Sequence, residues 1–91
     1  MCKEIFERLK HVRKPILDTA IEMEKVMREH DPARGNSWKT CSVEELYSHL
    51  SEEYIELNNE HYLKNRPEFI AREAIDIANM AMMIYTRSKE I

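Results

Sequence analysis

Apolar and polar positions along the chain follow the spacing of helices, and no stretch alternates for long as a strand would. The chain has one glycine and three prolines, so few residues interrupt this pattern. So few interruptions favour long helices. We predict four helices, over residues 3–12, 15–29, 43–63 and 67–89, with the polar segment 31–37 as a loop.

The third and fourth of these helices have the clearest boundaries. Ser42-Val43-Glu44-Glu45 is a capping box, with Ser42 at the N-cap. Pro67 suits the first turn of a helix, where its missing N–H needs no partner. The connection Lys64-Asn65-Arg66 is short, and a short connection makes two long helices antiparallel neighbours. We therefore predict one all-α domain over residues 1–91, built as an antiparallel bundle of four helices.

Composition and charge narrow the possible partners. The chain is 43% hydrophobic and 34% charged, with a net charge of −3 and no basic stripe, so we expect no nucleic-acid partner. The apolar run 74–85 contains Asp76 and Asn79 and is too short to span a membrane. Charged residues stand where a signal peptide would be apolar, so we expect a cytoplasmic protein. Cys2 and Cys41 are then expected to be free thiols.

Acidic residues lie beside the apolar stripe of the third predicted helix. Glu53 lies at the edge of the stripe, and Glu56 is turned about 60° further round the helix. Glu60 falls between the two in angle, one turn further along. The other acidic residues point elsewhere and are typical of a solvated surface; they are Glu44, Glu45 and Glu52. The stripe itself consists of Leu46, Leu50, Tyr54 and Leu57.

Glu73 and Asp76 lie in a stretch of the fourth helix that is otherwise almost continuously apolar. A carboxylate in such surroundings is unfavourable unless it is protonated, paired or bound to a metal. Two antiparallel helices can bring this pair opposite Glu53 and Glu56, and four crowded carboxylates require compensating positive charge. We therefore predict a metal site whose ligands are Glu53, Glu56, Glu73 and Asp76.

The predicted ligands are all hard oxygens, which favours Mg²⁺, with Mn²⁺ as the alternative, over zinc. A di-iron bundle would use Glu-x-x-His motifs, and none of the four histidines has a glutamate three residues before it. Pairs spaced as Glu-x-x-Glu are also common on solvated helix surfaces. The apolar surroundings of Glu73 and Asp76 are what favour the metal site over that interpretation.

Three further residues are candidates for substrate binding, each with a structural alternative. Trp38 can stack on a base or anchor its loop against the helices. Lys39 can reach a phosphate or remain solvated. Asn79, about one turn after Asp76, can hydrogen-bond a base or make a buried bond between helices.

At these residues the sequence resembles the MazG-like family of all-α nucleoside triphosphate pyrophosphohydrolases. The family signature is E-x-x-E, a spacer, then E-x-x-D, and sixteen residues separate Glu53-Tyr54-Ile55-Glu56 from Glu73-Ala74-Ile75-Asp76 here. The longer strings 52–57 and 73–84 are also similar to the family's, especially to its compact members. Segment 34–39 resembles the glycine-tryptophan loop of those members. The resemblance covers roughly residues 16–87.

The resemblance implies that Glu53, Glu56, Glu73 and Asp76 bind Mg²⁺. It also implies hydrolysis of an NTP or dNTP to the monophosphate and pyrophosphate, with Glu53 or Glu56 activating the water, and a homo-oligomer that is a dimer or tetramer. The run 74–85, apolar on nearly all sides, independently favours an oligomer built around the fourth helix. The alternatives are a non-catalytic helical oligomer or interaction module that retains the fold, and an acidic regulatory partner protein.

Overall fold

The computed structural model describes residues 2–90, apart from the side chains of Cys2 and Phe6. Every regular element in this part of the chain is helical, which confirms the all-α prediction. None of these helices is long and apolar enough to cross a membrane. Cys41 is a free thiol, as expected, whereas the Cys2 side chain lies outside the described part. The elements are α1 (Cys2–Leu9), α2 (Lys14–Arg34), a 3₁₀ turn (Ser37–Lys39), α3 (Val43–Asn59), a π-helical turn (Glu60–Lys64) and α4 (Pro67–Lys89).

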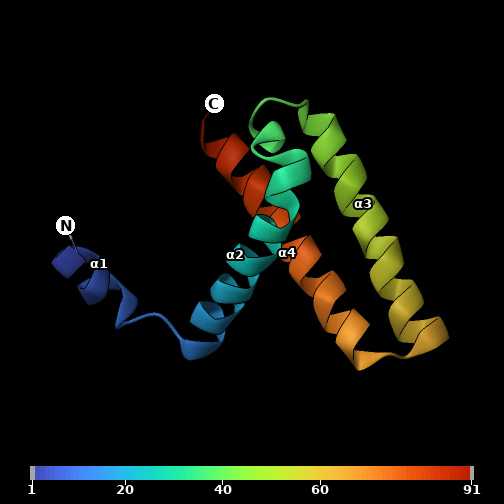
Figure 1. The fold of residues 1–91 in the computed structure, drawn as a ribbon, viewed down its shortest axis with the longest axis horizontal. Coiled ribbons are helices and arrows are strands. Elements are labelled where there is room, and N and C mark those ends of the chain that lie inside the picture. Colours follow the sequence, from blue (N-terminus) through green and yellow to red (C-terminus); the bar gives the residue numbers. More distant parts are fainter. Residues whose placement is uncertain (1, 91) are drawn as a thin grey trace.

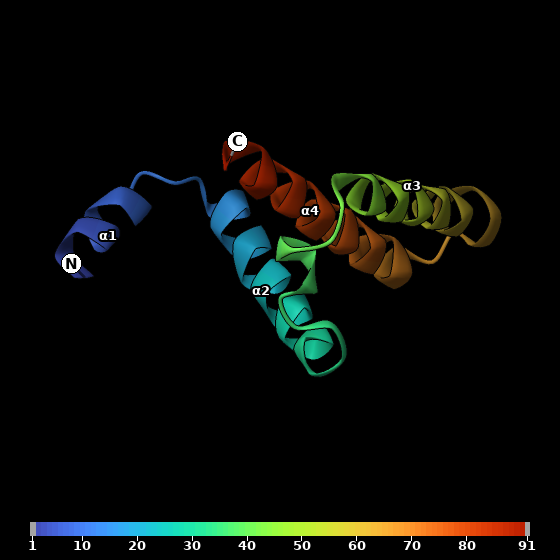
Figure 2. The same ribbon diagram turned by 90° about the horizontal axis from the view of Figure 1, so that it is seen from above.

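Helices α3 and α4 lie side by side and run in opposite directions (Figures 1 and 2). The predicted cap of α3 is confirmed, because the Ser42 hydroxyl accepts a hydrogen bond of 3.2 Å from the Glu45 N–H. Helix α4 begins at Pro67 as predicted. Between the helices, Asn65 adopts a left-handed backbone with φ 51°, which reverses the chain within two residues. This tight connection fixes the two helices as an antiparallel hairpin.

Helix α2 is longer than predicted, and the expectation of a loop from residue 31 was wrong. Residues 31–34 continue the helix through Pro32. Pro32 has no N–H to donate to the Arg28 carbonyl, so α2 lacks this one hydrogen bond and still continues to Arg34. The helix ends instead at Gly35, whose φ of 52° lies in the left-handed region that favours glycine. By contrast, α1 is shorter than predicted and ends at Leu9.

Helix α4 packs against both α3 and α2, and α1 stands apart from these three helices (Figures 1 and 2). The interior is small: the buried apolar side chains among the described residues are Val26, Leu46 and Met80, one from each packed helix. Tyr54, predicted within the apolar stripe of α3, is 58% exposed. The stripe is wider than the contact with α4, and α2 does not cover the remainder.

Candidate metal and ligand site

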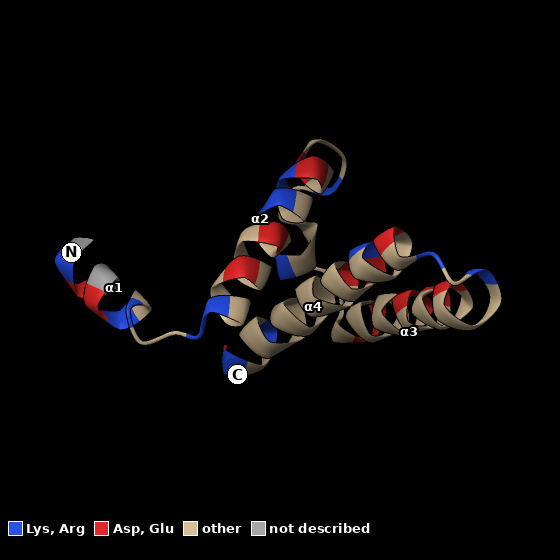
Figure 3. Ribbon diagram, turned by 90° about the horizontal axis from the view of Figure 1, so that it is seen from below, with Lys and Arg blue, Asp and Glu red and all other residues tan. Residues whose placement is uncertain are grey.

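Three of the four predicted ligands converge between α3 and α4. Glu53 comes from α3, and Glu73 and Asp76 come from α4. One carboxylate oxygen from each lies within 4.8 Å of the other two. The spacing of three residues places Glu73 and Asp76 on one face of α4, and the antiparallel neighbour brings Glu53 opposite them. Figure 3 shows acidic residues on both helices of this hairpin, although most of α4 is uncharged.

The fourth predicted ligand, Glu56, occupies a different position. Its side chain is exposed and does not belong to the group within 4.8 Å. It nevertheless lines the same cavity as Glu53 and Asp76. Its charge adds to the effect of burial in raising the pKa of Glu53, Glu73 and Asp76. Glu56 therefore stands beside the group, more open to solvent than the other three.

Among the described ion pairs, only Asp76 of the three converging carboxyls has a basic partner, Arg72, at 3.6 Å. Burial raises the pKa of Glu73 to about 8, and the adjacent Glu53 adds to this shift. Burial also raises the pKa of Glu53, where repulsion from Asp76 and Glu56 contributes. Burial likewise raises the pKa of Asp76, although Arg72 and then His30 oppose this shift. At neutral pH, simultaneous ionisation of Glu53, Glu73 and Asp76 is therefore unfavourable.

Two oxygens of this group have no hydrogen-bond donor among the described residues. They are Oε2 of Glu53 and Oε2 of Glu73, and both are buried. A buried carboxylate oxygen without a donor is unfavourable, and a proton shared between Glu53 and Glu73, an ion or another ligand can satisfy it. Oxygen donors from three carboxylates suit a hard divalent cation. The residues present therefore fit a hard divalent cation, and Mg²⁺ or Mn²⁺ stays a prediction.

A cavity of about 280 Å³ adjoins the carboxylates. Its volume is close to the lower end of the range for small-molecule sites, about 300–1,000 Å³. Acidic, basic, aromatic and apolar side chains share its wall, among them Glu53, Asp76, His30, Arg34, Trp38 and Met83. Such a wall can hold a ligand that combines a charged part with an apolar or planar part.

The three predicted substrate-binding residues differ in position. Trp38 lines the cavity, and its buried Nε1 has no hydrogen-bond partner among the described residues. Lys39 is exposed and lies outside the wall, with its Nζ 5.6 Å from the centre of the Trp38 ring. Asn79 is buried and joins α4 to α2, because its Nδ2 donates to the Met23 carbonyl over 3.2 Å. Asn79 also lines the cavity, and its Oδ1 has no hydrogen-bond partner among the described residues.

Arg87 ties the loop that carries Trp38 to the end of α4. Its Nη1 donates to the carbonyls of Trp38 and Cys41, over 2.9 and 2.8 Å. Charge-assisted bonds of this kind are stronger than bonds between neutral groups. Sequence analysis did not predict this role, because backbone carbonyls carry no side-chain signal.

Basic side chains also line the cavity wall. Arg72 contacts Glu29 at 2.9 Å and Asp76 at 3.6 Å. His30 and Arg34 of α2 line the same cavity. His30 follows the buried Val26 by four residues, and this spacing was a signal that could have placed it on the inner face of α2. The site thus offers positive charge beside its acidic group.

Comparisons of the chain with models of known protein families, with curated proteins and with solved structures found no match. The basis for assigning a function is the site itself, with its converging carboxylates and adjoining cavity.

Proposed function

We propose that this protein is a Mg²⁺-dependent pyrophosphohydrolase that cleaves an NTP or dNTP to the monophosphate and pyrophosphate. The observation that carries the proposal is the convergence of Glu53, Glu73 and Asp76 beside a cavity that also contains Trp38. A bound divalent ion would offset the charge of the triphosphate as the phosphorus–oxygen bond breaks. The resemblance of the sequence to the MazG-like family supplies the reaction class.

The remaining roles follow from the cavity wall. Glu53 and Glu56 are the candidates for activating water: Glu53 has a raised pKa, which strengthens a carboxylate as a base, and Glu56 is open to solvent. Arg34 and Arg72 can pair with phosphate oxygens, because a guanidinium matches their geometry. Trp38 lines the cavity and offers a ring face on which a base can stack.

The proposal includes a homo-oligomer, a dimer or tetramer, of MazG-like subunits. The chain exposes 7370 Å², whereas a compact monomer of 10.9 kDa exposes about 5,600 Å². Its radius of gyration is 15.0 Å, compared with about 12 Å for a compact domain of this length. The excess area is larger than the roughly 800 Å² that each partner buries in a standard interface. Large apolar side chains are among the exposed ones: Tyr54, Ile55, Tyr62, Leu63 and Tyr85.

Association is tested by sedimentation velocity over a dilution series. We expect a dimer or tetramer that persists to low micromolar concentration, because the exposed apolar area is large. A monomer at every concentration would contradict this part of the proposal without affecting the chemistry assigned to the carboxylates.

The activity is tested with a panel of ribonucleoside and deoxynucleoside triphosphates in the presence of Mg²⁺. We expect at least one of them to yield the monophosphate and pyrophosphate in equal amounts. The reaction should stop when EDTA removes the metal. Release of orthophosphate, or an intact panel, would overturn the assignment.

Variants connect the activity to the site. Glu53→Gln and Asp76→Asn should abolish hydrolysis and weaken Mn²⁺ binding, measured by electron paramagnetic resonance, while the circular dichroism spectrum stays unchanged. Glu52→Gln is the matched control, since Glu52 is exposed and next to Glu53 on the same helix. The alternative function, a non-catalytic helical oligomer, predicts that even the unaltered protein binds no Mn²⁺.

A further inference from the structure

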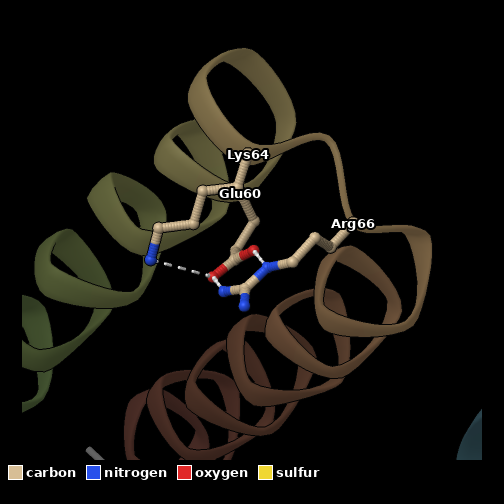
Figure 4. Close-up of polar contacts among 3 residues, drawn as sticks. All are labelled: Glu60, Lys64 and Arg66. Atoms are coloured by element: carbon tan, nitrogen blue, oxygen red, sulfur yellow. Dashed lines mark hydrogen bonds and ion pairs between the residues drawn. The ribbon is translucent and has the colours of Figure 1, made fainter.

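Glu60 has an unusual environment for a charged residue. It lies at the start of the π-helical turn that extends α3 and is only 8% exposed. Arg66 holds it with two hydrogen bonds, from Nε to Oε2 over 2.9 Å and from Nη2 to Oε1 over 2.6 Å. The Lys64 ammonium lies 3.7 Å from Oε1 (Figure 4). Two parallel bonds between planar groups fix their relative orientation as well as their distance.

Arg66 is itself held in place. Its guanidinium carbon lies 4.0 Å from the centre of the Phe69 ring, where a cation is attracted to the ring face. Its carbonyl accepts hydrogen bonds of 3.0 Å from the N–H groups of Phe69 and Ile70, because Arg66 caps α4. The pair therefore joins the last turn of α3 to the beginning of α4 across the tight connection, as Figure 4 shows.

The position of this pair relates directly to the carboxylate group. Glu60 follows Glu53 by seven residues on α3, and Arg66 precedes Glu73 by seven residues on the α4 side. Along α3, seven residues make about two helical turns, roughly 10.5 Å. Arg66 is the N-cap of α4, one residue outside that helix. The pairs Glu60–Arg66 and Glu53–Glu73 therefore lie near the same line of contact between the antiparallel helices. Sliding one helix by a single turn would move it about 5.4 Å. This displacement exceeds the 4.8 Å within which the oxygens of Glu53, Glu73 and Asp76 lie. It would also separate the Glu60 carboxylate from the Arg66 guanidinium.

We propose that the Glu60–Arg66 pair is a positioning clasp: it fixes the register of α3 against α4 and so holds Glu53 within reach of Glu73 and Asp76. Neither residue of the clasp lines the cavity or belongs to the group of converging carboxylates. A buried carboxylate disfavours any register that leaves it unpaired, so the clasp selects one alignment of the hairpin. The inference rests on the proposed function in so far as the aligned carboxylates bind a metal.

Two variants test the clasp without altering any predicted ligand. Glu60→Gln removes the charge, and Arg66→Lys keeps the charge but cannot make the two parallel bonds. Each should raise the dissociation constant for Mn²⁺ about tenfold, at the low end of the effect of residues that orient metal ligands. The exchange Glu60→Arg with Arg66→Glu should restore part of the affinity. A dissociation constant within twofold of the original in both single variants would overturn the proposal.

A control separates register from general loss of stability. Val26→Ala removes a buried side chain of α2 from the protein core, and Val26 does not line the ligand cavity. It should lower the melting temperature while leaving Mn²⁺ affinity unchanged at temperatures where the protein is folded. If Val26→Ala weakened Mn²⁺ binding as much as Glu60→Gln, the clasp would be a general stabilising contact and the proposal would fail.

A measurement without metal distinguishes failure of the clasp from failure of the proposed function. Spin labels at the exposed positions Ser51 and Ala74 report the distance between α3 and α4, with the native cysteines replaced and the labelled chain diluted in unlabelled protein. In Glu60→Gln the distance distribution should shift or broaden by about one helical turn, roughly 5 Å. An unchanged distribution would overturn the clasp. Absence of Mn²⁺ binding in the unaltered protein would overturn the proposed function, and the distance would still decide the clasp.

Discussion

Glu60 and the group formed by Glu53, Glu73 and Asp76 lie along the same contact between α3 and α4, about two helical turns apart. Their environments are opposite. The hydrogen bonds from Arg66 lower the pKa of Glu60. Burial raises the pKa of Glu73 to about 8, and its Oε2 has no donor among the described residues. Arg66 thus supplies hydrogen bonds to the Glu60 carboxylate, whereas no described residue supplies a donor to Oε2 of Glu73. The position of a carboxylate on a helix therefore does not decide its role; its partners do.

Replacement of Glu73 by glutamine gives the largest effect expected from this contrast. Glu73→Gln should lower pyrophosphohydrolase activity by a factor of about 100 or more, because a bound metal ion stabilises the transition state by several kcal/mol. The metal-free variant should melt at a higher temperature than the unaltered protein at pH 7, because no carboxyl then has to be held neutral against its ordinary pKa. Pyrophosphate release and thermal melting in EDTA measure the two results.

Glu52→Gln is again the control, and it should change neither quantity, because Glu52 is exposed. The contrast would break if Glu73→Gln kept its activity or melted at a lower temperature, since Glu73 would then be a structural group like Glu60.

The dependence of stability on pH is the next largest effect. Between pH 4.5, the ordinary pKa of a glutamate, and about pH 8, the folded metal-free protein holds a proton on Glu73 that the unfolded chain releases. This contribution to stability therefore declines as the pH rises through that interval. The difference in melting temperature between the unaltered protein and Glu73→Gln isolates it, and Mg²⁺ should abolish it by displacing the proton. A difference that is constant from pH 5 to pH 8.5 in EDTA would contradict the prediction.

The clasp should respond to pH with the opposite sign. Because its folded pKa is lowered, Glu60 contributes stability that is present above about pH 4.5 and is lost as the pH falls through the folded value. The advantage of the unaltered protein over Glu60→Gln in urea unfolding should thus be full at pH 7 and shrink by pH 3. We expect only a small change in the free energy of unfolding, because a single group is involved. An advantage that is equal at both pH values would show that the ion pair does not stabilise the fold.

Features that depend on local chemistry or helical period could be predicted from the sequence. The Ser42 cap, the start of α4 at Pro67 and the shared face of Glu73 and Asp76 each follow from a few neighbouring residues. Pro32 was interpreted as part of a loop, but a proline can remove one hydrogen bond without ending its helix, and α2 continues to Arg34.

Features that depend on pairing between elements could not be predicted. The angle of Glu60 on α3 was evident, but its bond to Arg66 depends on a π-helical turn and a left-handed Asn65. The greater exposure of Glu56 compared with Glu53 depends on how far α4 covers α3, and helical angles alone do not give this.

Arg87 sharpens the comparison from a third position, because its charge, like that of Arg66, is satisfied, but by backbone carbonyls of the Trp38 loop. Arg87→Met should raise the KM for the nucleotide about three- to tenfold, which corresponds to roughly 1 kcal/mol of lost binding, and should change kcat less. The reason is that the loop loses two charge-assisted bonds, whereas the carboxylates are untouched. Lys89→Met, an exposed change on the same turn, is the control and should leave KM unaltered. A fall in kcat at constant KM would instead place Arg87 with the groups that act on the reacting phosphate.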